Sequence, residues 1–144
     1  MKVIHYGSKT FDTDKFKPVK NKNWVKPDGG LWSSPIDSNF GWKDWNEVEE
    51  FKDCREDNSF ILELRDSCKI LKIDSKEDFQ EIEYITEEGY LDYEKISKIY
   101  DAIWLTEKGE NETRFLGIES SADFYGWDCE TILILNTYCF EECL

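Results

Sequence analysis

Short apolar runs separated by polar stretches recur along the whole chain and set its expected architecture. Four of these runs have the length and the β-branched or aromatic content of strands. The predicted strands cover residues 3–6, 31–34, 102–106 and 131–135. The last run is apolar almost throughout, so we expect a central strand that is covered on both faces.

Two more apolar runs, residues 60–64 and 68–73, are separated by the polar residues 65–67. Arginine, aspartate and serine in this order are typical of a turn. The spacing therefore predicts that the two runs pair as a β-hairpin.

Helical spacing is found in three places. A helix over residues 42–51 is predicted to pack through one aromatic face, because its apolar residues follow one another at intervals of three. These residues are Trp42, Trp45, Val48 and Phe51. Ser75, with Asp78 three residues later, predicts the capped start of a second helix. A third helix is expected over residues 92–100. With strands early, middle and late, the fold class is α+β.

The composition indicates one folded domain over residues 1–144. Six Trp, seven Tyr and nine Phe supply large apolar side chains that disordered chains lack. A chain of this length buries a core without needing disulfides or a metal.

Charge is unevenly spread along the chain, whose net charge is −14. Residues 1–52 carry nine Lys or Arg against eight Asp or Glu, whereas residues 53–144 carry nine against 24. The first third is therefore the natural place for an anionic ligand. The remainder would repel duplex nucleic acid, whose binding depends on cations that neutralise phosphates. The acids alternatively serve solubility, or imitate nucleic acid towards a basic protein.

The five cysteines form an odd set without a Cys-x-x-Cys pair, so we expect free thiols in a reducing cytoplasm and no metal site. No signal peptide is expected, because only two apolar residues follow Met1 and Lys2 before the first polar one. No apolar run approaches the roughly 20 residues that span a bilayer, so no membrane association is expected.

Candidate chemistry starts with His5, the only histidine, which lies at the end of the first apolar run. Glu130 directly precedes the predicted buried strand, where a carboxylate is costly unless it has partners. If the chain is extended there, Asp128 and Glu130 lie on the same side. Two carboxylates that face one cleft perturb each other's pKa, which makes them catalytic candidates. A structural role remains open for both His5 and Glu130.

Trp32, Ser33 and Ser34 follow two glycines and offer an aromatic ring with two hydroxyls. Trp32 or Tyr6 could stack on a flat ring while Ser33 or Ser34 binds its polar edge. The alternative is that Trp32 only packs in the core.

Together these segments resemble the ADP-ribosyltransferase superfamily. In that superfamily a first-strand histidine or arginine, a second-strand aromatic or Ser-rich segment and a glutamate opening a late strand converge on NAD. The segments that carry the resemblance are His5 with Gly7 and Ser8, residues 30–34, residues 100–104, and Asp128 and Glu130 running into residues 132–136. They occur in the expected order along the chain.

The resemblance implies a split mixed or antiparallel sheet with flanking helices, and with NAD, the substrate, in its cleft. His5 would bind a ribose hydroxyl, Trp32 or Tyr6 would stack on the nicotinamide, and Glu130 would stabilise the charge that develops during bond cleavage. The lysines of the first third, Lys20, Lys22 and Lys26, would attract the pyrophosphate. Asp128 stands where the superfamily often has an acceptor-directing Gln or Glu.

The working hypothesis is a small cytoplasmic ADP-ribosyltransferase-like protein that transfers ADP-ribose to an unidentified acceptor. Its size and acidity would suit a phage or mobile-element origin. One alternative is a non-catalytic acidic inhibitor that binds a basic protein through exposed carboxylates. These would be Glu81, Glu83, Glu87, Glu88, Asp92 and Glu94. The other alternative is a module that binds and sequesters a nucleotide.

Overall fold

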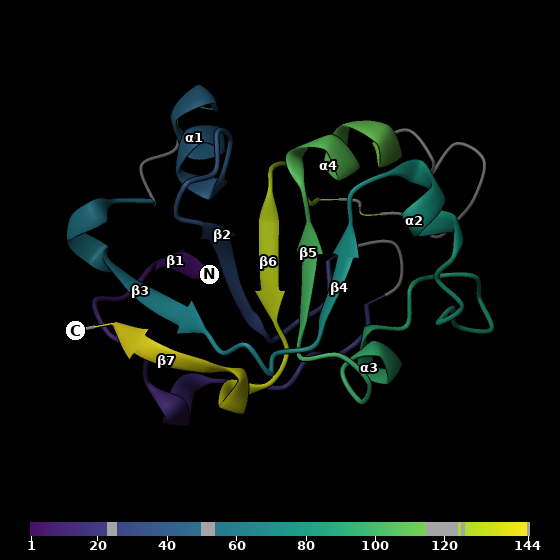
Figure 1. Cartoon of the computed structure of the whole chain (residues 1–144), viewed down its shortest axis with the longest axis horizontal. Coiled ribbons are helices and arrows are strands. Elements are labelled where there is room, and N and C mark those ends of the chain that lie inside the picture. The colour runs from purple at the N-terminus through teal and green to yellow at the C-terminus, as the bar shows by residue number, and fades with distance from the viewer. Residues whose placement is uncertain (23–25, 50–53, 115–123, 125, 144) are drawn as a thin grey trace.

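A mixed sheet of seven strands runs through the described part of the chain (Figure 1). This computed structural model describes residues 1–22, 26–49, 54–114, 124 and 126–143. The strands are β1 (Lys2–Tyr6), β2 (Leu31–Pro35), β3 (Ser59–Leu64), β4 (Ile70–Ile73), β5 (Ala102–Leu105), β6 (Thr131–Ile134) and β7 (Phe140–Cys143). The helices are α1 (Trp42–Val48), α2 (Lys76–Gln80), α3 (Tyr93–Ile96) and α4 (Glu107–Thr113), with short 3-10 turns at Thr13–Lys15, Glu56–Asn58 and Thr137–Cys139.

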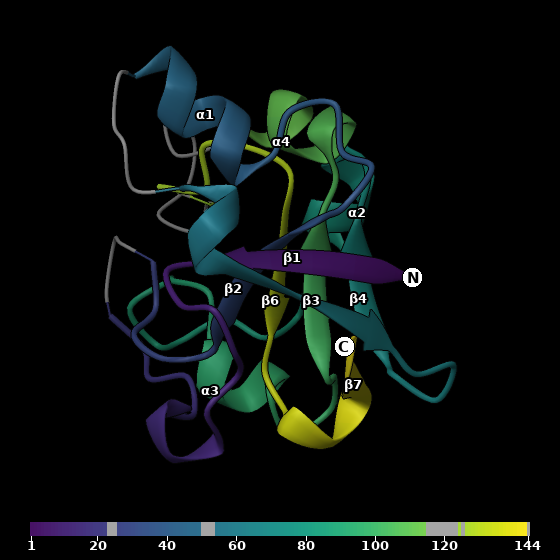
Figure 2. The ribbon, with the colours of Figure 1, turned by 90° about the vertical axis from the view of Figure 1, so that its left-hand side faces the viewer.

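The sheet has two halves that meet at β2. Its strand order is β4-β5-β6-β2-β1-β3-β7, and all neighbours are antiparallel except β4 and β5. The first part of β2 pairs with β6, through residues 31–33, and its last two residues pair with β1. Figure 2 shows β1 and β3 crossing the direction of β5 and β6. The predicted α+β domain with a mixed sheet is confirmed.

Strand β6 is covered on both faces, as its apolar sequence predicts. Ile132 and Ile134 belong to a core that also contains Val3 and Leu62, so it draws on both halves of the sheet. Leu133 and Leu135 belong to a second core, on the opposite face, with residues of α2 and α3. Alternate residues of β6 therefore enter different cores, and a polar residue at any of these positions would be buried.

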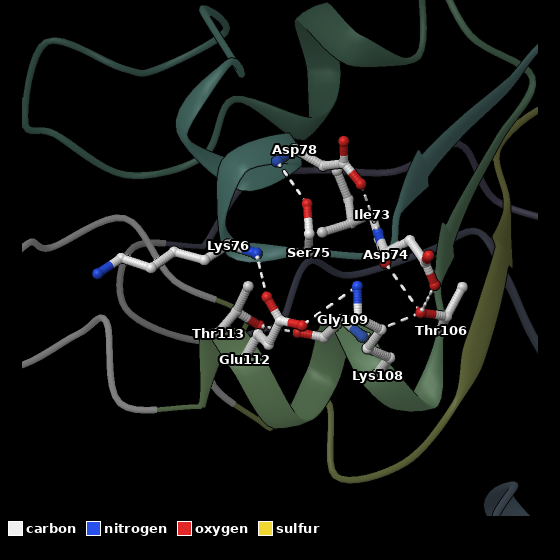
Figure 3. Close-up of polar contacts among 10 residues, drawn as sticks. All are labelled: Ile73, Asp74, Ser75, Lys76, Asp78, Thr106, Lys108, Gly109, Glu112 and Thr113. Atoms are coloured by element: carbon white, nitrogen blue, oxygen red, sulfur yellow. Dashed lines mark hydrogen bonds and ion pairs between the residues drawn. The ribbon is translucent and has the colours of Figure 1, made fainter.

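Helix α2 begins as the sequence predicts. The Ser75 side chain accepts a hydrogen bond from the Asp78 amide (3.1 Å), which satisfies one of the free amides at the helix start (Figure 3). The Asp78 carboxylate accepts from the Asp74 amide (2.9 Å), so the start of the helix is tied to the end of β4.

Helix α4 is not predicted by the sequence pattern, because its residues are mostly polar. Its N-cap is Thr106, whose hydroxyl accepts from the Gly109 amide (2.9 Å) and donates to the Asp74 carboxylate (2.6 Å) (Figure 3). A Cβ atom at Gly109 would lie 2.0 Å from the Ile73 carbonyl oxygen. Only glycine therefore lets α4 pack this closely over the end of β4.

The predicted hairpin of residues 60–64 and 68–73 is wrong. Strand β3 pairs with β1 and β7, whereas β4 lies at the far edge of the sheet and pairs with β5 in parallel. The connection from β3 to β4 crosses from one half of the sheet to the other, because other segments accept hydrogen bonds from its backbone amides. The Arg65 amide donates to the Cys139 carbonyl (2.8 Å) and the Lys69 amide to the Asp101 carboxylate (2.9 Å).

Two predicted helices are shorter than expected. Helix α1 ends at Val48, which is 66% exposed and so does not extend the aromatic face, and Phe51 lies outside the described residues. Helix α3 ends at Ile96, and beyond it the amides of Lys98 and Ile99 bond to carbonyls three residues back. This tighter turn rotates Ile99 towards solvent, where it is 42% exposed.

Candidate functional site

His5 is fixed where the end of β1 meets the start of β2. Its Nδ1 donates to the Trp32 carbonyl (2.6 Å), and its ring lies 5.0 Å from that of Phe60. Burial lowers the pKa of His5, while the bond to the Trp32 carbonyl acts in the opposite direction. A neutral imidazole whose Nδ1 carries the proton offers Nε2 as a hydrogen-bond acceptor. His5 can therefore accept a bond from a ligand hydroxyl.

We expect protonation of His5 to destabilise the fold. Because its pKa in the folded state is below 6.5, the unfolded chain takes up this proton first. The stability that neutral His5 contributes is complete above about pH 6.5 and is lost as the pH falls through the lowered pKa. Urea unfolding of wild type and His5→Gln, from about pH 7.5 to about pH 5, should show a greater loss for wild type. Parallel losses would contradict a lowered pKa, since all other titrating groups are shared.

A cavity of about 240 Å³ opens beside His5. It is lined by Ile4, His5, Tyr6, Lys26, Pro27, Trp32, Trp42 and Cys54, and is called the aromatic cavity below. The rings of Trp32 and Trp42 lie 6.2 Å apart at 84°. Burial raises the pKa of the Tyr6 phenol, against the effect of the Lys43 ammonium, so Tyr6 stays neutral. The structure thus brings His5, Tyr6 and Trp32 together, as predicted.

The loop that carries Lys26 is fastened on both sides. Lys20 and Asp28 exchange backbone hydrogen bonds of 2.9 and 3.0 Å. The Asn21 side chain donates to the Asp92 carboxylate (2.9 Å) and accepts from the Tyr93 amide (2.8 Å), which ties the loop to α3. The Lys26 ammonium lies 5.4 Å from the Trp32 ring and 5.0 Å from the Trp42 ring. An aromatic surface and a cation therefore share the aromatic cavity.

The two serines of β2 are engaged within the protein. Ser33 is buried and its hydroxyl donates to the Ile132 carbonyl (2.7 Å), which joins β2 to β6. The Ser34 hydroxyl accepts from the Trp42 amide (3.0 Å) and donates to the Glu130 carbonyl (3.0 Å). Both hydroxyl protons are used, so in this state neither serine donates to a ligand. Ser34 instead links the wall of the aromatic cavity to Glu130.

Glu130 has the partner that its position requires. Its Oε2 accepts from the Trp104 indole N–H of β5 (2.8 Å), and its amide donates to the Phe40 carbonyl (3.0 Å). The Lys72 ammonium lies 4.5 Å from the centre of the Trp104 ring, on the same side of the sheet. The carboxylate is thereby held in one orientation by a neutral donor.

The side chains of Glu130 and Trp32 lie on opposite faces of the sheet. Ser33 pairs with Ile132, and Ile132 pairs with Trp104, so the side chain of Glu130 lies on the face of the sheet that carries Ser33. Trp32 alternates with Ser33 and points to the opposite face. Glu130 is accordingly not among the residues that line the aromatic cavity.

Asp128 and Glu130 have different surroundings, because the chain bends at Cys129 instead of remaining extended. Asp128 lines a separate hollow of about 550 Å³ between α1 and α4, with Trp45, Glu110 and Arg114 among its other residues. Arg114 and Glu110 pair in that hollow (2.9 Å). The expected arrangement of Asp128 and Glu130 on one side is not found.

Sequence reasoning missed two residues of the site. Trp104 is recognisable only once β5 is known to lie beside β6, since its bond to Glu130 crosses between strands. Trp42 fits a helix face, yet it also lines the aromatic cavity. The signal available in the sequence was the Gly41-Trp42 pair that follows β2. In the structure, a Cβ atom at Gly41 would lie within 3 Å of the Ser34 side chain, a contact that glycine avoids.

Comparison of the chain with family models, curated proteins and solved structures finds no match. None of the described helices has the length and apolar character to cross a membrane. None of the five cysteines forms a disulfide in the described part of the chain. Of the six candidate carboxylates for an acidic inhibitor, all but Asp92 are exposed, but Asp92 and Glu94 both bond to Asn21. That binding hypothesis stays a prediction.

Proposed function

We propose that this chain is an ADP-ribosyltransferase-like protein that transfers ADP-ribose from NAD to an acceptor. The observation that carries the proposal is the convergence of three distant segments on adjacent strands. His5 on β1 bonds to Trp32 on β2, and Ser34 on β2 bonds to Glu130 at the start of β6. These are the segments on which the resemblance to the superfamily depends.

The aromatic cavity suits one end of NAD. Drug-sized ligands take pockets of roughly 300–1,000 Å³, so 240 Å³ is appropriate for a ring with part of its sugar. Trp32 and Trp42 present ring faces on which a positively charged nicotinamide can stack. His5 Nε2 can accept from a ribose hydroxyl, and Lys26, with Lys20, supplies positive charge for the pyrophosphate, whereas Lys22 is paired with Asp28.

Glu130 would act on the nicotinamide ribose after its carboxylate leaves the Trp104 indole and turns from the face of the sheet that carries Ser33 towards the aromatic cavity. Ser34 bonds both the Trp42 amide and the Glu130 carbonyl, so the carboxylate-bearing residue lies two hydrogen bonds from the cavity wall. The bond between ribose C1′ and the ring nitrogen breaks, and its electron pair leaves with the nicotinamide, which becomes neutral. A lone pair of the acceptor bonds to C1′ and the acceptor proton passes to solvent. Once turned towards the ribose, the carboxylate would stabilise the positive charge that develops at C1′ between bond breaking and bond formation.

A nucleotide-sequestering module is the second candidate. It is favoured by one observation, that Glu130 is not among the lining residues of the aromatic cavity. This candidate retains the binding of NAD by His5, Trp32 and Trp42 but has no turnover.

Two labels on NAD distinguish these functions. One preparation carries the label in the nicotinamide and the other in the adenosine, and each is incubated with the protein and a cell extract. A transferase releases nicotinamide and leaves the adenosine label on an acceptor in equal amount. Binding without release would establish the sequestering function in its place, and the absence of NAD binding would refute both.

A further inference from the structure

Lys26 places its charge on the aromatic walls of the cavity and not on a carboxylate. Its ammonium is within 5.4 Å of two tryptophan rings, a distance at which a cation is attracted to the ring face. Among the described residues no ion pair involves Lys26, whereas Lys22 in the same loop pairs with Asp28 (3.3 Å). Most described lysines likewise form no ion pair, so what distinguishes Lys26 is the contact of its ammonium with two tryptophan rings.

The stem of Lys26 runs over Gly126. A Cβ atom at Gly126 would lie 3.1 Å from Cγ, 3.3 Å from Cδ and 3.4 Å from Cε of Lys26. Gly126 therefore leaves room for the stem, and its φ of +85° is a conformation that favours glycine. Helix α1 lies beyond the end of β2 (Figure 1) and contributes Trp42 to the lining of the cavity. The ammonium thus sits at the meeting point of Trp32 and Trp42.

We propose that Lys26 is a resident cation of the aromatic cavity, and that a positively charged aromatic ring displaces it from the faces of Trp32 and Trp42. Two cations cannot share one pair of ring faces, because each repels the other and each requires the same negative surface. Lys26 is solvent-exposed, so its ammonium can leave the rings for water or for a ligand phosphate without burying its charge. The preferred ligand class is a pyridinium that is linked to an anionic group.

The inference rests on the proposed function for its natural ligand. In NAD the ring is positive, and the displaced ammonium can move to the pyrophosphate of the same molecule. After the glycosidic bond breaks, nicotinamide is neutral and no longer competes for the ring faces as a cation.

Three small probes test the inference separately from catalysis. They are 1-methylnicotinamide, which is a cation, nicotinamide, which is neutral, and ADP-ribose, which lacks the ring. Binding to wild type and Lys26→Met is measured by calorimetry. Lys26→Met should bind 1-methylnicotinamide about threefold or more tightly than wild type does, because the competing charge is gone. Its affinity for nicotinamide should be unchanged. ADP-ribose should weaken by about threefold or more, because a phosphate contact is lost.

Lys22→Met is the matched control, since it removes the same charge from the same loop outside the cavity and should leave all three affinities unchanged. Equal binding of 1-methylnicotinamide to wild type and Lys26→Met would overturn the inference. So would an equal gain with Lys22→Met, which would indicate a general effect of charge. If Lys26→Met binds 1-methylnicotinamide more tightly, as expected, but NAD is neither bound nor cleaved, the inference about Lys26 is supported and the proposed function is refuted.

Discussion

Glu130→Gln is expected to lower kcat for nicotinamide release about 100- to 1,000-fold while the KM for NAD changes less than about threefold. Glutamine keeps the size of the side chain, and its amide oxygen can still accept the Trp104 N–H. The variant therefore removes the negative charge and little else. Because the charge on the ribose develops only in the transition state, its loss should affect the chemical step and not the binding of NAD. Steady-state release of labelled nicotinamide gives both constants.

Glu107→Gln is the control for this loss of charge, because Glu107 is exposed on α4 and makes no described ion pair. It should behave as wild type. An unchanged kcat in Glu130→Gln would remove Glu130 from the mechanism. A raised KM with unchanged kcat would assign it to binding alone.

Gly109→Ala is expected to destabilise the protein by about 3 kcal/mol or more. The new methyl group would lie 2.0 Å from the Ile73 carbonyl oxygen, and this neighbour is backbone, so it cannot rotate away. Either α4 shifts from β4 or the end of β4 moves, and both disturb the bonds of Thr106 to Gly109 and Asp74. Urea unfolding followed by tryptophan fluorescence measures the change.

Glu107→Ala, two residues earlier on α4, adds no contact and should cost less than about 1 kcal/mol. A Gly109→Ala variant as stable as wild type would show that α4 and β4 are not packed this closely. An equal loss in both variants would point to a general effect of substitutions in α4 and not to the contact with Ile73.

The local signals in the sequence predicted strands and helix starts well. The continuous apolar run before Asn136 identified β6 as a strand with two covered faces, and its residues do enter two cores. Ser75 was recognisable as an N-cap because a hydroxyl directly before a helix accepts a hydrogen bond from one of its free backbone amides. Helix α4 was not recognisable, because it carries little apolar pattern and its position depends on the contact of Gly109 with Ile73.

Strand pairing could not be predicted from the same signals. The spacing before and after Arg65 suited a hairpin, but the bonds that direct the chain elsewhere come from Cys139 and Asp101, which are remote in sequence. The candidate site shows the same difference between local signals and contacts that depend on strand pairing. His5 and Trp32 were identified from their own segments, whereas the donor for Glu130 comes from Trp104 on a neighbouring strand. Alternation also placed Trp32 and Glu130 on opposite faces, which depends on the register of β2 with β6.

The central claim is that NAD binds in the aromatic cavity, and the indole N–H resonances of the tryptophans report on it most directly. Trp32→Phe and Trp42→Phe variants assign the two signals in a nitrogen–proton correlation spectrum. On titration with NAD, the Trp32 and Trp42 signals should show the largest shifts and should saturate with one dissociation constant. Binding of NAD that leaves both signals unchanged, or an absence of shifts at any tryptophan, would contradict the account.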